Sequence, residues 1–120
     1  MIIAGLMMLT AAQAGPAPVD SLESQPSADI VVIGRRARAV RWDWRVDKGG
    51  RLTKCKITRS SGDKDIDQIG CEATRRCAAG GIRKAAPMKA CIVPVRNELI
   101  RALADARAEQ RARRLDNAEN

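Results

Sequence analysis

Four cysteines are the residues of this chain with the most recognisable chemistry. Cys55, Cys71, Cys77 and Cys91 include no Cys-x-x-Cys pair, which argues against a zinc knuckle and against a redox-active dithiol. We expect structural disulfides, provided that the protein is exported. On one continuous helix Cys71 and Cys77 would lie about 9 Å apart along the axis, too far for a mutual bond. Two pairings remain, and geometry alone favours Cys55 with Cys77, because Cys77 falls on the apolar stripe of the helix.

No other residues form a recognisable catalytic or cofactor site. The chain has no histidine, the commonest general base and metal ligand. Ser60-Ser61-Gly62 indicates a helix cap, since it has no Gly-x-Ser-x-Gly elbow. The following acids, Asp63, Asp65 and Asp67, lack the glycine and glutamate spacing of an EF-hand, and Gly80-Gly81 is not followed by a P-loop lysine. We expect no enzyme, no cofactor and no metal.

The N-terminus predicts export. Ile2–Leu9 is an apolar run, and Ala12-Gln13-Ala14 after it is typical of a signal-peptidase site. Residues 1–14 are therefore expected to be a signal peptide. The run is shorter than the about 20 apolar residues that a membrane span needs. No basic residue precedes it, so a misassigned start or a buried helix is the alternative to a signal peptide. Residues 15–28 contain three prolines and predict an extended linker. We expect a periplasmic or secreted mature chain with no transmembrane segment.

A β-hairpin must position the first cysteine. Apolar and charged residues alternate from Val40 to Val46, and a similar alternation runs from Thr53 to Thr58. The two glycines of Asp47–Gly50 predict the tight turn between them. Leu52 falls on the charged side, which predicts a bulge or an edge contact. The predicted pairs are Val46 with Arg51, Trp44 with Thr53, Trp42 with Cys55, Val40 with Ile57, Asp43 with Lys54, Arg41 with Lys56 and Arg45 with Leu52.

The remaining segments predict an α+β fold. A helix begins at Ser60–Asp63 and ends at Ala78–Gly81, and its Gly70 should admit a close approach to the sheet. A second helix begins near Pro87 and is broken or kinked at Pro94. The β-branched run Asp29–Arg36 is expected to be a third strand, or else a docking segment. We place the domain at residues 29–106 and a charged tail at 107–120, which is either frayed or a solvated helix held by pairs such as Glu109 with Arg113.

The hairpin holds most of the positive charge. The formal net charge of the chain is +8, and Arg35–Arg59 contains ten basic and two acidic residues. Such a face suits an anionic surface, such as lipopolysaccharide or phospholipid, or an acidic partner, and it also serves simple solubility. Nucleic acid is not expected, since base stacking needs aromatic residues. The candidate contact surface is Arg41, Arg45, Lys54 and Lys56.

Between Val46 and Asp67 the chain resembles the C-terminal domain of TonB-type energy transducers. The matching segments are Val46–Leu52, Ile57–Gly62 and Ile66-Asp67, where that family has a strand ending in Val-Asp, a glycine and arginine turn, Ser-Ser-Gly and a helix opening with Leu-Asp. Some members of that family carry cysteines at the positions of Cys55 and Cys71. The resemblance therefore implies the pairing Cys55 with Cys71, which leaves Cys77 with Cys91.

The departures from that family limit the functional expectation. A TonB transducer has a membrane-spanning helix, a long Pro-rich spacer and a third strand that completes its sheet. Here no span is predicted, the linker is short, and Cys91 and a helix replace the region of that third strand. The resemblance implies a binding mode in which a sheet edge accepts a partner peptide as an added strand. We therefore expect a non-catalytic periplasmic interaction module that binds an envelope protein or peptide. The alternative is a basic envelope protein that binds anionic surfaces.

Overall fold

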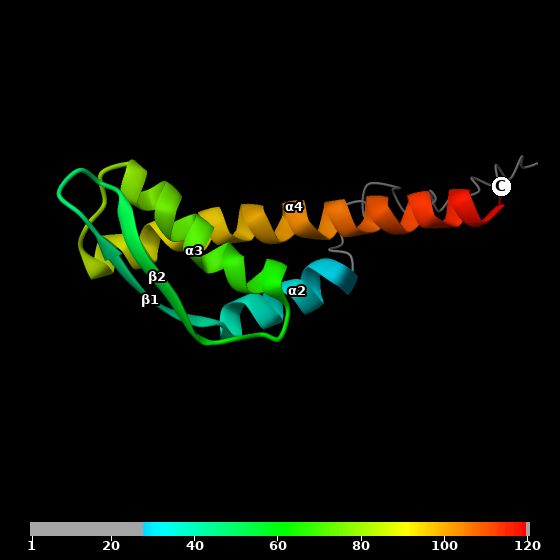
Figure 1. Ribbon diagram of the computed structural model, residues 1–120, viewed down its shortest axis with the longest axis horizontal. Helices are drawn as coiled ribbons and strands as arrows, with labels where there is room; N and C mark the ends of the chain where they lie inside the picture. Colours follow the sequence, from blue (N-terminus) through cyan, green and yellow to red (C-terminus); the bar gives the residue numbers. More distant parts are fainter. Residues whose placement is uncertain (1–27, 120) are drawn as a thin grey trace, which may run out of the picture.

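A computed structural model describes residues 28–119 of the chain. Its elements are α2 (Ala28–Ala39), β1 (Arg41–Val46), β2 (Leu52–Arg59), α3 (Lys64–Ala79) and α4 (Ala85–Glu119) (Figure 1). One antiparallel hairpin and three helices make a small α+β fold, as the sequence predicted. The predicted signal peptide and all of the predicted linker except Ala28 lie outside the described residues. No helix in the described range is both long enough and apolar enough to cross a membrane.

The prediction of a strand at Asp29–Arg36 is wrong, because this segment forms most of helix α2. Its apolar residues recur at helical spacing, and Ile33 and Ala37 are buried, as is Val40 just after the helix. They pack in one cluster with residues of α3 and α4. Burial of this face outweighs the modest strand preference of β-branched residues. The hairpin therefore remains two-stranded in the part of the chain that is described.

The hairpin forms as predicted, but its register differs by two residues. Trp44 faces Cys55 and Trp42 faces Ile57. One residue of the difference arises in the turn: the Asp47 carboxylate accepts bonds from the N–H groups of Gly49 and Arg51, each at 2.9 Å, so that Asp47 and Arg51 close a three-residue loop.

The other residue of the difference is a bulge beside Leu52. Val46 pairs with Leu52 and Arg45 with Lys54, so Thr53 has no partner across the ladder. The predicted bulge is thus confirmed, and it moves Leu52 to the side of Val46. The charged pairs change accordingly: Asp43 faces Lys56, Arg45 faces Lys54 and Arg41 faces Arg59.

Helix α3 begins at the predicted cap. The Asp63 side chain accepts bonds from the N–H groups of Asp65, at 3.0 Å, and Ile66, at 3.4 Å. The Asp67 carboxylate in turn accepts from the Ser61 N–H and hydroxyl, each at 2.7 Å, and from the Ser60 hydroxyl. The helix ends at Ala79 with Gly80 as its C-cap, within the predicted Ala78–Gly81, and Gly81 follows with a φ of +96°.

Helix α4 runs through Pro94 without a break. Proline removes the N–H that would bond to the carbonyl of Ala90, but both residues are exposed, so water can satisfy that carbonyl. The charged tail continues the helix, and Arg113 pairs with Glu109 at 2.6 Å. Of the two predicted alternatives, a frayed tail or a solvated helix, the structure therefore has the solvated helix. Arg107 pairs with Asp63 at 2.7 Å, so the first part of this tail still contacts the N-terminus of α3.

Helix α3 lies at the centre of the fold. It packs against both strands and against α2 and α4. One core cluster joins α2, the start of α3 and the middle of α4, and the second joins the end of α3 to the start of α4. Trp42 contacts both clusters, which makes it the side chain that connects the hairpin to the whole core.

Candidate functional site

The cysteines form two disulfides, Cys55 with Cys71 and Cys77 with Cys91, with Cα atoms 5.9 Å and 6.0 Å apart. This confirms the pairing that the resemblance implied and shows that the geometric preference for Cys55 with Cys77 is wrong. Cys77 is buried at the end of α3 in a cluster with Met88 and Ile92 of α4, the helix that carries its partner Cys91. The first bond ties β2 to α3, and the second ties α3 to α4.

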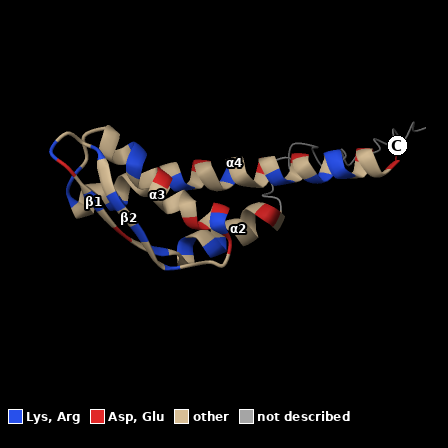
Figure 2. Cartoon of the chain, viewed as in Figure 1, with Lys and Arg blue, Asp and Glu red and all other residues tan. Residues whose placement is uncertain are grey.

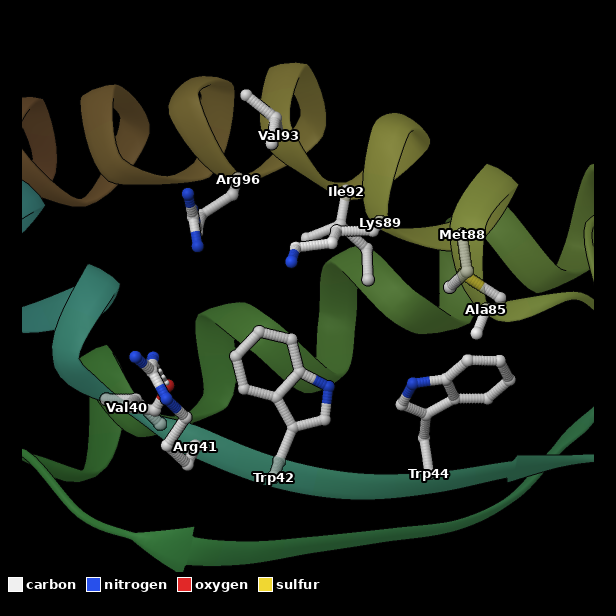
Figure 3. A pocket seen from close by; sticks show the side chains of 10 residues that line it. All are labelled: Val40, Arg41, Trp42, Trp44, Ala85, Met88, Lys89, Ile92, Val93 and Arg96. Atoms are coloured by element: carbon white, nitrogen blue, oxygen red, sulfur yellow. Dashed lines mark hydrogen bonds between the residues drawn. The ribbon is translucent and has the colours of Figure 1, made fainter.

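A groove lies between β1 and the first half of α4. Its volume is about 480 Å³. Trp42 and Trp44 point from β1 toward α4 (Figure 3). The groove thus combines an apolar floor with basic side chains from both walls. Its lining residues are Val40, Arg41, Trp42, Trp44, Ala85, Met88, Lys89, Ile92, Val93 and Arg96.

Trp42 is held in place by α3. Its indole N–H donates to the Thr74 hydroxyl at 3.0 Å, and that hydroxyl donates to the Gly70 carbonyl at 2.7 Å. A Cβ atom on Gly70 would lie 2.6 Å from the Trp42 ring. The predicted close approach at Gly70 is therefore confirmed, and it fixes one part of the groove floor.

The edge of β1 that borders the groove has no partner strand among residues 28–119, since the sheet consists of β1 and β2 alone. The Arg45 carbonyl accepts a bond from the Thr53 hydroxyl at 3.2 Å, and so points toward β2. Backbone groups of successive strand residues point in opposite directions. The N–H and C=O groups of Trp44 and Trp42 therefore point toward the open edge, where an added strand could bind them.

Arg41 and Arg96 line the end of the groove where β1 begins, and Arg38, near the end of α2, lies close enough to act on the charge of Arg96. The Arg41 guanidinium donates to the carbonyls of Arg38, at 2.9 Å, and Val40, at 3.2 Å. Arg96 reaches in from α4, and its Nε atom is buried with no hydrogen-bond partner among residues 28–119. Burial, and then the positive charges of Arg38 and Arg41, lower the pKa of Arg96 from its ordinary value. We call Arg38, Arg41 and Arg96 the arginine cluster.

The predicted contact surface is only partly brought together. Arg45 and Lys54 face each other across the hairpin, and Lys56 faces Asp43; all four side chains are exposed. Basic residues recur along the hairpin, where they are coloured blue in Figure 2. Arg41 instead turns toward the end of α2 and lines the groove. Its binding role, like that of the other three basic residues, stays a prediction.

A second hollow of about 630 Å³ lies beside β2 and is a weaker candidate. The disulfide between Cys55 and Cys71 is part of its wall. Its Glu72 is already paired with Arg75 at 2.5 Å, which lowers the pKa of the carboxyl group. The groove beside β1, by contrast, has the cations Arg41, Lys89 and Arg96, for which residues 28–119 provide no carboxylate partner.

Sequence analysis missed the α4 wall of the groove, including Arg96. A signal was present: Ile92, Arg96 and Ile100 follow one another at four-residue spacing, so a charged residue interrupts the apolar stripe. Both isoleucines are buried. Over the described residues no group of three potential ligands could hold a metal ion, and Asp63 and Asp67 serve as cap acceptors. Comparisons with models of known protein families, with curated proteins and with solved structures found no match.

Proposed function

We propose that this protein is an exported, disulfide-stapled interaction module that binds an extended peptide of an envelope protein along the free edge of β1. The observation that carries the proposal is the open edge of β1 beside a groove with an apolar floor. An added strand would bond to the outward backbone groups of Trp42 and Trp44, and its side chains would contact the two indole rings. Two disulfides and the predicted signal peptide support an oxidising compartment, the periplasm or the exterior.

Photocrosslinking from within the groove would identify the partner. Ala85 and Val93 are exposed residues of the α4 wall, and a benzophenone amino acid placed at either would contact a peptide bound there. Leu115 is 69% exposed and lies on the far part of α4, so the same probe at Leu115 is a matched control. The proposal requires one peptide segment captured at both groove positions and absent from the Leu115 control.

Backbone methylation of the captured segment then tests the binding mode. The segment is synthesised with N-methyl groups on alternate residues, in the two possible phases. Added strands bind through every second N–H, so one phase should weaken binding at least tenfold and the other should have little effect. Equal affinity of both phases would refute strand addition. Mass spectrometry of periplasmic material tests export, for which the mature chain should begin at or near Gly15.

The second candidate function is binding of an anionic surface through the outer face of the hairpin. The observation that favours it is the pairing of Arg45 with Lys54, since facing like charges gain from an external anion. Binding of vesicles that contain phosphatidylglycerol, or of lipopolysaccharide, should then decline steeply up to about 0.5 M salt. Changing Arg45, Lys54 and Lys56 to Gln should reduce that binding and leave capture at Ala85 unchanged. Vesicle binding that survives the triple change would exclude this face.

A further inference from the structure

The arginine cluster has no counterion within the described chain. The ion pairs formed there by Asp29, Asp63, Asp65, Glu72 and Glu109 all involve other arginines. Arg96 lies on the buried stripe of α4, and its Nε is buried without a hydrogen-bond partner in the part of the chain that the structure describes. A buried donor without an acceptor is unfavourable, and more so when it is charged. These three guanidinium groups therefore form a site that an anion would stabilise.

The residue types indicate which anion would bind. A guanidinium group offers two parallel N–H donors that match the two oxygens of a carboxylate. The Arg41 guanidinium is already oriented by its bonds to the carbonyls of Arg38 and Val40, so little of its freedom is lost when an anion binds. The site is also joined to the groove, because Arg41 and Arg96 line one end of it.

We infer that the arginine cluster binds the carboxylate of an acidic residue in the peptide that occupies the groove. This inference rests on the proposed function and adds the chemistry of the partner. The cluster lies beside the first residues of β1, next to Trp42, and Trp44 is the following residue on the same face of the strand. Because side chains on one face of a strand are two residues apart, the partner should carry Asp or Glu two or four residues from an apolar side chain that contacts the indole rings. Lys89, on the α4 wall, adds a further positive charge along the same groove.

Selection from a random peptide library on the oxidised mature protein tests this inference. The parent protein should select peptides with Asp or Glu at one fixed position relative to an apolar residue. The Arg96→Gln variant should select peptides with the apolar residue but without the fixed acid. Replacement of that acid by Gln in a selected peptide should weaken binding to the parent at least tenfold and binding to Arg96→Gln less than twofold. Arg101 is an exposed arginine of the same helix, and Arg101→Gln is the matched control.

A second measurement follows the site without a peptide. Acetate and inorganic phosphate are titrated at constant ionic strength while the Nε–H signals of the arginines are observed by NMR. The Arg96 signal should shift saturably, the Arg101 signal should not, and Arg41→Gln should weaken the shift. Circular dichroism and intact disulfides confirm that each variant is folded.

Each outcome bears on a separate claim. Selected peptides that bind the groove without a fixed acid would overturn the inference and leave the proposed function standing. Failure to select any peptide, with the acetate shift retained, would overturn the proposed function and the peptide assignment together. An unsaturable shift at Arg96 would show that the cluster is not an anion site. Binding to phosphatidylglycerol vesicles that is lost in Arg96→Gln, without any peptide preference, would reassign the site to a lipid phosphate.

Discussion

Replacing Gly70 by Ala tests the packing on which the groove depends. A Cβ at this position would lie 2.6 to 2.8 Å from three atoms of the Trp42 ring, well inside normal contact distance. The ring has little room to retreat, because its N–H is bonded to Thr74 and the side chain packs against both core clusters. We therefore expect Gly70→Ala to displace the indole and destabilise the fold.

Two opposing effects decide the magnitude. Alanine favours the helix over glycine by about 1 kcal/mol. Against this, overpacking in a core costs about 1–3 kcal/mol, and loss of the Trp42 to Thr74 bond costs about 0.5–1.5 kcal/mol. The clash prevails, and the free energy of unfolding should fall by about 1–3 kcal/mol. For a domain of this size each kcal/mol lowers Tm by about 4–8 °C.

Urea unfolding of the oxidised protein, followed by tryptophan fluorescence and by circular dichroism, measures this effect. Gly34→Ala is the matched control, since Gly34 is also a buried helical glycine and its Cβ would meet only the flexible end of Arg38, at 3.2 Å. That control should be neutral or more stable by up to about 1 kcal/mol. If Gly70→Ala is as stable as Gly34→Ala, the Trp42 ring does not lie over Gly70, and the position of this ring in the floor of the groove is refuted.

Three further predictions concern the elements that hold the groove. Asp63→Ala removes the cap of α3 and should lower stability by about 1 kcal/mol in urea unfolding, whereas Asp116→Ala, on the exposed part of α4, should have almost no effect. Replacing Cys77 and Cys91 together by Ser should cost about 3 kcal/mol, the entropy of a loop of this length, as measured by thermal unfolding. Stability should also fall in acid, because a hydrogen bond from Arg51 lowers the pKa of Asp47 and hydrogen bonds from Ser60 and Ser61 lower the pKa of Asp67. The stabilising contribution of these two carboxylates is present above about pH 4 and is lost as the pH falls through their folded pKa values. Urea midpoints compared at about pH 7 and about pH 3 would measure this loss.

The local elements of the domain could be predicted from the sequence because their signals are local. Alternation and two glycines determine a hairpin, and Asp63 before an amphipathic run determines the start of α3. The register could not be predicted, because it depends on the Asp47 side chain, which closes the turn one residue later than assumed, and on the bulge at Thr53. Each adds one residue of shift, and both leave the apolar face intact, so the alternation pattern alone does not distinguish the two registers.

The error at α2 has a different cause. Ile30, Val31, Val32 and Ile33 have strand preference, but the same segment also has helical periodicity through Ile33 and Ala37. The outcome depends on what each arrangement can bury. As a helix, the segment places Ile33 and Ala37 against α3 and α4, while Val31 and Val32 stay 43% and 48% exposed. Tertiary packing of this kind is not visible in eight residues read alone.

The groove itself could be predicted least, because it forms between segments that are far apart in the sequence. Its two walls, β1 and α4, do not bond to each other in the described structure. The strand β1 is held by the ladder to β2 and by the hydrogen bond from Trp42 to Thr74 of α3, and α4 is held to α3 by the disulfide between Cys77 and Cys91. The bond from Cys55 to Cys71 then fixes β2 to the same helix. A groove whose walls are fixed before binding loses little conformational freedom when a ligand enters. The two disulfides therefore serve binding as well as stability, since the ordering cost that remains falls mainly on the peptide.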